Sequence, residues 1–167
     1  APVGRREPSG NRIMHRLFAA GLALALGAVA PVLSADDNPA VAKLNRDIPR
    51  HKEFLKRIEQ SKGAGDVVFL GDSITHGWEG QKAWQEHFGS FNPVNLGIGG
   101  DQTGHVLWRI TEGKELDNLK PKAAVIMIGT NNTAAHSAEQ IAGGITAIVE
   151  ELKKQKPGIK ILVLGVF

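Results

Sequence analysis

Residues 67–78 read VVFLGDSITHGW, and the change of character within this stretch decides the fold class. The first four residues are apolar, and β-branched or aromatic side chains dominate them, so we expect a short strand buried on both faces. The run then breaks at Gly71, Asp72 and Ser73 before a segment of helical length. Ser73 is therefore expected where a strand gives way to a helix.

The same pattern recurs twice further along the chain. Val94-Asn95-Leu96 leads into Gly-Ile-Gly-Gly-Asp at 97–101, and the apolar run 123–128 leads into Gly-Thr-Asn-Asn at 129–132. A fourth apolar run, 159–167, continues to the last residue without a turn. We expect each of these runs to be a strand of one sheet.

Segments of helical length separate the strands. Apolar residues recur at helical spacing over 49–62, and over 137–154 they form one face after a capping box made by Ser137 and Gln140. Strands that alternate with helices pair in parallel through right-handed crossovers. The sequence therefore predicts an α/β fold of three layers (α/β/α), a flavodoxin-like parallel sheet covered by helices on both faces.

Composition narrows the range of functions. With 167 residues, of which 42% are hydrophobic and 22% charged, the chain is typical of one globular domain. The formal net charge of +3 comes from arginines within residues 1–35, and the remainder carries equal numbers of acidic and basic side chains. A neutral body lacks the electrostatic footprint of a nucleic-acid-binding protein, so we expect no nucleic-acid partner.

The N-terminal residues have the pattern of an export signal. We interpret residues 1–13 as an upstream extension, 14–35 as a signal peptide with cleavage near Ala35, and 36–48 as a polar lead-in. The apolar run is shorter than the roughly 20 residues that span a bilayer, and the sequence contains no cysteine for a disulfide or a lipid. We therefore expect a secreted or periplasmic protein without a stable membrane anchor.

Polar residues that follow three of the strands form a candidate catalytic site. In an open parallel sheet the turns after the strands emerge at one carboxyl edge, where ligands bind. This topology is expected to bring Ser73, Gly100 and Asn131 close together. The Ser73 hydroxyl could attack an ester, while the N–H groups of Ser73 and Gly100 and the Asn131 amide hold the oxyanion that forms. The combination is typical of acyl transfer.

Each piece alone has a simpler explanation, since Ser73 could cap a helix, residues 97–100 could form a plain turn and Asn131 could end a strand. Together, and in this order, they resemble the SGNH (GDSL-type) hydrolases, and among these the catalytic subunits of platelet-activating-factor acetylhydrolase. The resemblance runs from about residue 50 to Phe167 and is carried by four blocks: VVFLGDSITHGW (67–78), NLGIGGDQTGHVLWRI (95–110), PKAAVIMIGTNN (121–132) and AEQIAGGITAIV (138–149).

The resemblance implies a role for each motif residue. Ser73 matches the family's nucleophile, Gly100 and Asn131 match its oxyanion residues, and Asp72 matches a residue that orders the turn. It also implies a hydrolase domain over 49–167 and a mechanism without metal or cofactor. The implied substrate is a small-molecule, glycan or lipid ester, with acetyl esters favoured, and the oligomeric state stays open.

The family's last block, Asp-x-x-His, supplies the general base and has no counterpart in this sequence. Asp101 and His105 are one residue too far apart, and His76 lies one helical turn after Ser73, so neither histidine suits the role. The resemblance thus implies a domain that is incomplete at its C-terminus. An alternative stays open, in which a catalytically inert hydrolase fold binds an ester or a glycan without hydrolysing it.

Other types of site fit less well. Residues 97–100 resemble a dinucleotide-binding loop, but Gln102 stands where its third glycine belongs. The histidines are scattered and no cysteine accompanies them, which argues against a metal site. We expect His51, His87 and His136 at the surface or at helix ends. The three tryptophans are expected in the core or in a pocket wall.

Overall fold

The computed structural model describes residues 37–166. The expected extension at 1–13 and the expected signal peptide at 14–35 lie outside these residues. The lead-in contains a short 3-10 helix, η2 (Pro39–Val41), which begins after Asn38, whose side chain accepts a hydrogen bond from the Ala40 N–H (2.9 Å). No helix of the described part is long and apolar enough to cross a membrane.

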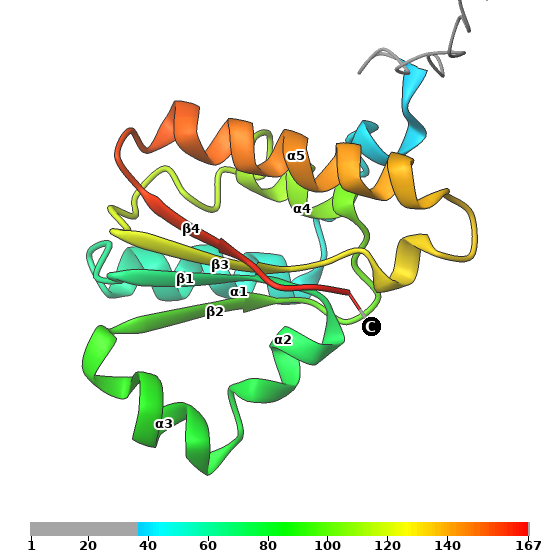
Figure 1. Cartoon of the computed structure of the whole chain (residues 1–167). Coiled ribbons are helices and arrows are strands. Elements are labelled where there is room, and N and C mark those ends of the chain that lie inside the picture. The colour runs from blue at the N-terminus through cyan, green and yellow to red at the C-terminus, as the bar shows by residue number, and fades with distance from the viewer. Residues whose placement is uncertain (1–36, 167) are drawn as a thin grey trace, which may run out of the picture. The chain divides into compact units, whose positions relative to one another are not determined.

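A four-stranded parallel sheet forms the centre of the fold. β1 (Val67–Gly71) pairs with β2 (Pro93–Gly97) on one side and with β3 (Ala123–Met127) on the other, and β4 (Lys160–Val163) pairs with β3. The strand order is β2-β1-β3-β4 (Figure 1). The parallel pairing of all four strands confirms the predicted sheet.

The fourth strand is shorter than the expected run over 159–167. The Leu164 N–H still donates to the Ile126 carbonyl (2.9 Å), but β3 ends at Met127. The chain then turns away at Gly129, whose φ of 128° is a conformation that favours glycine. After Leu164, residues 165 and 166 make no further ladder bond to β3.

Helices cover both faces of this sheet, which confirms the three-layer architecture. Figure 1 shows α4 (Thr103–Ile110) and α5 (Ala138–Gln155) on one side, and α2 (Ser73–Trp78) and α3 (Lys82–Phe88) on the other. From α1 (Pro49–Gln60), Phe54 and Ile58 belong to the same core cluster as apolar residues of α4 and α5. Two more 3-10 helices are η3 (Gly89–Phe91) and η4 (Thr130–Asn132).

The strands direct alternate side chains to the two layers of helices. Leu70 and Ile126 are fully buried in the core cluster that includes α1, α4 and α5. Phe69 points to the other side, where its ring contacts those of Trp84 (4.6 Å between centroids) and Phe88 (5.2 Å). Both faces of the central strands are therefore apolar, as the uninterrupted apolar runs predicted.

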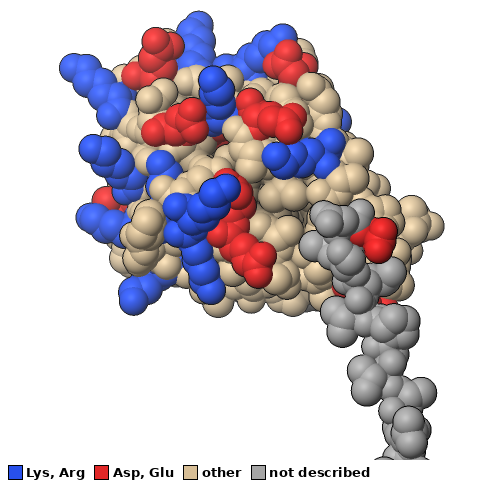
Figure 2. All heavy atoms as spheres, turned by 90° about the horizontal axis from the view of Figure 1, so that it is seen from above, with Lys and Arg blue, Asp and Glu red and all other residues tan. Residues whose placement is uncertain are grey.

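On the face shown in Figure 2, basic and acidic side chains are interspersed, and neither kind forms a patch of its own. The described residues also include exposed ion pairs, such as Lys154 with Glu151 (3.5 Å) on α5. Pairs of this kind contribute little to stability because solvent screens them. The mixed charge of this face agrees with the neutral composition of the body.

Candidate active site

Ser73 is the first residue of α2 and directly follows the turn at the end of β1. Asp72 caps this helix: it is 2% exposed, and its Oδ1 accepts a hydrogen bond from the Ile74 N–H (2.9 Å). Ser73 itself is exposed to solvent. The buried carboxylate thus orders the turn, and the serine hydroxyl is accessible at the carboxyl edge of the sheet.

The second element of the site is the turn over Ile98, Gly99, Gly100 and Asp101. The Asp101 N–H closes it by donating to the Ile98 carbonyl (3.2 Å), and Gly100 has φ +80°, which a residue with a side chain adopts with strain. A Cβ built on Gly99 would lie 3.8 Å from the Ser73 Cβ. The glycine turn therefore lies in contact range of the serine.

Asn131 reaches the same place from η4, the 3-10 turn after β3. Its Nδ2 donates to the Asp101 carbonyl (2.8 Å) and lies 3.4 Å from Oδ2 of Asp72. Gln102 returns the contact by donating its side-chain amide to the Asn131 carbonyl (2.9 Å). The structure thus brings Ser73, Gly100 and Asn131 together, as the topology predicted.

A buried polar network joins the second and third turns beneath the site. Asn132 accepts a hydrogen bond from the Thr103 N–H (3.0 Å) and donates one to the Thr103 hydroxyl (3.1 Å). That hydroxyl donates to the Ala40 carbonyl (2.7 Å), which fastens the lead-in to the site. The roles of Asn132 and Thr103 were not predicted from the sequence. The polar composition of the two turns is the only feature of the sequence that could have indicated them.

A chain of charged side chains runs from the site into the core. The Asp101 carboxylate receives Arg46 Nε (2.7 Å) on Oδ1 and Arg109 Nε (2.9 Å) on Oδ2. Arg109 Nη1 also donates to Glu115 (2.6 Å), whose other oxygen contacts His51 Nδ1 (2.8 Å). Of the two expected places, surface or helix end, His51 takes the second: it lies in the first turn of α1, and this pairing allows the ring to be only 2% exposed.

Within this network of charged side chains, neighbouring groups alter one another's pKa values. Burial raises the pKa of the Asp101 carboxyl, and the charges of Arg109 and Arg46 oppose that rise. For Arg109, burial lowers the pKa, but Glu115 and Asp101 outweigh it, so that the pKa lies above its usual range and the guanidinium stays charged. The carboxylates and guanidiniums therefore depend on one another to remain ionised away from water.

Neither histidine near the motif is joined to Ser73. His105 occupies the first turn of α4, where its Nδ1 accepts a hydrogen bond from the Gln102 N–H (2.9 Å). Burial lowers the pKa of His105, and the charges of Arg46 and Arg109 lower it further. His76 lies on α2, and no hydrogen bond among residues 37–166 connects its ring to the Ser73 hydroxyl. None of the described residues can therefore be identified as the general base.

His105 makes folding stability depend on pH. Its pKa in the folded protein is lower than in the unfolded chain, so the unfolded state binds the proton more readily. The contribution is present above the unfolded pKa of about 6.5 and is lost as the pH falls through the folded pKa. We expect the free energy of unfolding to fall between about pH 7.5 and about pH 5 more steeply for the wild type than for His105→Gln.

Glutamine is the matched replacement because it can accept the same backbone hydrogen bond and does not titrate. Urea unfolding at a series of pH values measures the difference. Parallel curves for the two proteins would contradict the assignment of the titration to His105.

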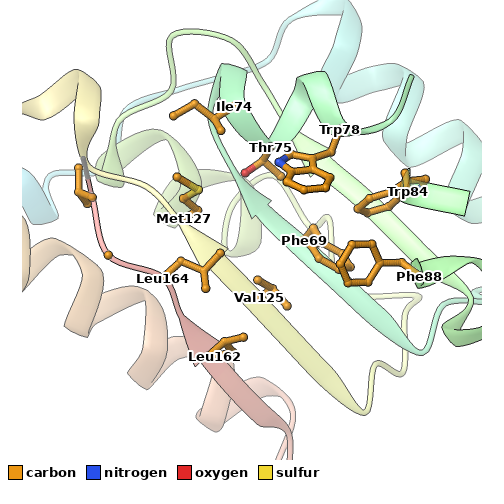
Figure 3. Close-up of a pocket in the computed structure, with 12 residues that line it drawn as sticks. Phe69, Ile74, Thr75, Trp78, Trp84, Phe88, Val125, Met127, Leu162 and Leu164 are labelled. Atoms are coloured by element: carbon orange, nitrogen blue, oxygen red, sulfur yellow. The ribbon is translucent and has the colours of Figure 1, made fainter. Parts of the chain in front are cut away.

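The described residues also form an apolar cavity, and none of the candidate site residues lines it. It measures about 600 Å³ and lies between the sheet and helices α2 and α3, with Trp78, Trp84, Met127 and Leu162 in its wall (Figure 3). This placement confirms the expectation for Trp78 and Trp84, and Trp108 is buried in the core. The cavity is almost purely apolar, whereas the polar groups of the candidate site lie at the carboxyl edge of the sheet.

Metal ligands do not gather anywhere in residues 37–166: no three His, Asp or Glu side chains lie close enough to hold an ion. The candidate site therefore consists of one hydroxyl and of amide donors. Such a set can attack a carbonyl carbon and stabilise an oxyanion.

Comparison with known proteins agrees with this chemistry. The model of the GDSL-like lipase/acylhydrolase family matches residues 69–167. Platelet-activating factor acetylhydrolase IB subunit alpha2 from Homo sapiens is 48% identical over 121 residues, which are 72% of this chain and 51% of that protein. The subunit alpha2 from Gallus gallus is 40% identical over 138 residues, 78% of this chain and 58% of that protein.

Solved structures show the same likeness. A GDSL-like lipase from Bacteroides thetaiotaomicron has a TM-score of 0.53 and 26% identity, over 68% of this chain and 56% of the other. The chain spans about half the length of the curated relatives it matches. Because the family match includes Ser73, Gly100 and Asn131, the chain belongs to the GDSL-like lipase/acylhydrolase family, the SGNH hydrolases, whose chemistry is that of an esterase.

Proposed function

We propose that the protein is a serine esterase that hydrolyses short acyl esters, acetyl esters first among them, through an acyl-enzyme on Ser73. The observation that carries the proposal is the meeting of Ser73, the Gly99–Gly100 turn and Asn131 at one edge of the sheet. Acyl transfer needs a nucleophile with donors aimed at the oxyanion, and these residues supply both.

In the proposed reaction, Ser73 Oγ forms a bond to the ester carbonyl carbon and its proton passes to the histidine of an Asp-x-x-His block, which the family resemblance implies and residues 37–166 do not contain. The carbonyl oxygen becomes an oxyanion, held by the N–H groups of Ser73 and Gly100 and by Asn131 Nδ2. The alcohol then leaves with a proton, and water releases the acid from the acyl-enzyme. Asp72 contributes by ordering the turn that presents Ser73.

The acetyl preference follows from the relatives, which are named platelet-activating factor acetylhydrolase subunits. The alcohol part of the ester can be a lipid, a glycan or a small molecule, since nothing in the turns selects among them. If the protein is exported, as we propose below, O-acetylated glycans are the substrates to test first.

A second candidate is the inert fold that binds an ester without cleaving it. It is favoured by one observation: no histidine of the described part is hydrogen-bonded to the Ser73 hydroxyl. The two candidates differ in whether Ser73 reacts. A fluorophosphonate, which loses fluoride when a nucleophilic serine attacks phosphorus, distinguishes them.

We expect peptide mass spectrometry of the probe-treated protein to place the phosphonyl group on Ser73, with Ser73→Ala unlabelled. A label on another residue would overturn the nucleophile. No label, together with no hydrolysis of p-nitrophenyl acetate, would favour the binding protein.

We also propose that the protein is exported and processed. The apolar run within residues 14–35 ends in small residues at Ala35, the pattern that signal peptidase recognises. N-terminal sequencing of the protein secreted by an expressing cell should read from near Asp36. A mature protein that retains residues 17–30 would exclude cleavage at this place.

A further inference from the structure

Arg46 contacts the site from a distant part of the sequence. It lies in the lead-in between η2 and α1, and its side chain is 23% exposed. Nε donates to Asp101 Oδ1 (2.7 Å), and Nη2 donates to the Gly99 carbonyl (2.7 Å). One guanidinium thus bonds to both ends of the segment that contains Gly100.

The bond to Gly99 has a direct consequence for Gly100. The Gly99 carbonyl and the Gly100 N–H belong to one peptide unit, which is planar and trans, so the two groups point in opposite directions. Holding the oxygen of this unit therefore sets the direction of its N–H. The position needs such a restraint, because the two glycines of this turn have wide conformational freedom.

The N–H groups of Gly99 and Gly100 have no acceptor among the described residues. The N–H groups of Ile98 and Asp101, on either side of the two glycines, donate to the carbonyls of Gly71 (3.1 Å) and Ile98 (3.2 Å). Gly100 is exposed, so its N–H is available to a ligand. A cation bonded to the carbonyl of the same peptide polarises the unit and strengthens this donor.

Asp101 connects the restraint to the rest of the site. Its carboxylate is fully buried and lies between Arg46 and Arg109, and its carbonyl accepts the Asn131 amide (2.8 Å). Asp101 therefore fixes both candidate oxyanion donors that lie outside α2, the Gly100 N–H and the Asn131 amide. Arg109, itself buried and bonded to Glu115, anchors the arrangement in the core.

We propose that Arg46 is a positioning residue, which holds the Gly99–Gly100 peptide so that the Gly100 N–H is aimed at the oxyanion. The inference rests on the acyl transfer at Ser73 proposed above. It assigns to Arg46 an effect on the transition state, where the oxyanion exists, rather than on substrate binding.

Arg50 is a matched control for Arg46. Its side chain is 19% exposed, and it too bonds one carboxylate, Glu79 (3.0 Å), and one glycine carbonyl, that of Gly97 (2.9 Å). The N–H of that peptide is already bonded, because it is the Ile98 N–H that donates to Gly71. Loss of Arg50 therefore removes comparable bonds without freeing a catalytic donor.

The experiment compares Arg46→Gln, Arg46→Lys and Arg50→Gln in the hydrolysis of p-nitrophenyl acetate, in a chain that also carries the family's Asp-x-x-His block. We expect Arg46→Gln to lower kcat by about 10- to 100-fold with little change in KM, since a misaimed group costs up to about 10²-fold. Lysine can reach only one of the two acceptors, so Arg46→Lys should restore part of kcat. Arg50→Gln should keep kcat close to that of the wild type.

Ser73→Ala, measured in parallel, distinguishes a failure of the proposed esterase function from a failure of the proposed role of Arg46. If it abolishes hydrolysis while Arg46→Gln matches Arg50→Gln, the esterase stands and the role of Arg46 is overturned. If Ser73→Ala retains turnover, the proposed function falls, and the effect through Gly100 falls with it.

Hydrogen exchange at the Asp101 amide, followed by NMR, tests the restraint without any turnover. Arg46→Gln should raise this exchange rate by at least about tenfold relative to the wild type and to Arg50→Gln, because the N–H that closes the turn loses its support. Unchanged exchange would overturn the inference. If Arg46→Gln does not fold, Arg46→Lys, which keeps the charge beside Asp101, gives the same comparison.

Discussion

In a chain that also carries the family's Asp-x-x-His block, which every turnover comparison here requires, Ser73→Ala is expected to lower kcat for p-nitrophenyl acetate by at least about 10³-fold, the scale on which serine hydrolases lose activity without their nucleophile. The Thr103 hydroxyl, which lies near the same turns, is buried and already donates to the Ala40 carbonyl (2.7 Å). The fold should be unaffected, because Ser73 is exposed and the cap of α2 comes from Asp72. Initial rates, with the melting temperature measured alongside, give the comparison.

Ser90→Ala is the matched control, since Ser90 is also an exposed serine in a helical turn but lies in η3. Its turnover should equal that of the wild type. A Ser73→Ala protein that hydrolyses the ester as fast as Ser90→Ala would remove Ser73 from the mechanism.

Much of the fold could be predicted because each buried strand leaves a local signal. The runs that became β1, β2 and β3 are apolar and end at glycines, so their limits were predicted within one or two residues. The capping box at Ser137 and Gln140 likewise placed the start of α5, where both bonds are present. The end of β4 could not be predicted, because it depends on where its neighbour β3 turns away.

The meeting of the site residues was also predictable, although they are far apart in sequence. Parallel strands put their carboxyl ends at one edge, so Ser73, Gly100 and Asn131 had to converge there. Their assignment to catalytic roles, by contrast, remains a prediction that the variants described here test.

The charged chain beneath the site could not be predicted from the sequence. Its pairs join positions such as Arg46 with Asp101 and His51 with Glu115, which are separated by 55 and 64 residues. No local pattern records such a pairing, and a charged residue on an amphipathic helix is most simply placed in solvent. His51 was therefore expected at the surface or at a helix end; it lies in the first turn of α1, but its pairing with Glu115 buries it.

Asn131→Ala is expected to lower kcat by about 10²- to 10³-fold, the cost of removing one oxyanion donor. The geometry of the amide shows how it can serve the transition state. One of its N–H bonds is engaged by the Asp101 carbonyl at 2.8 Å, which fixes the side chain, whereas the distance to Asp72 Oδ2 is 3.4 Å and that bond is weak. A developing oxyanion can therefore take the second hydrogen at small cost.

Asn131→Asp sharpens this test, since it keeps the shape of the side chain but replaces the donor by a carboxylate. The new charge would face the Asp72 carboxylate and the Asp101 carbonyl, and it would repel the oxyanion, so kcat should fall below that of Asn131→Ala. Thr133→Ala, an exposed change just after η4, should leave kcat unaltered. If Asn131→Ala lost less than about threefold while remaining folded, the amide would have no part in stabilising the oxyanion, and the Ser73 and Gly100 N–H groups would have to hold it alone.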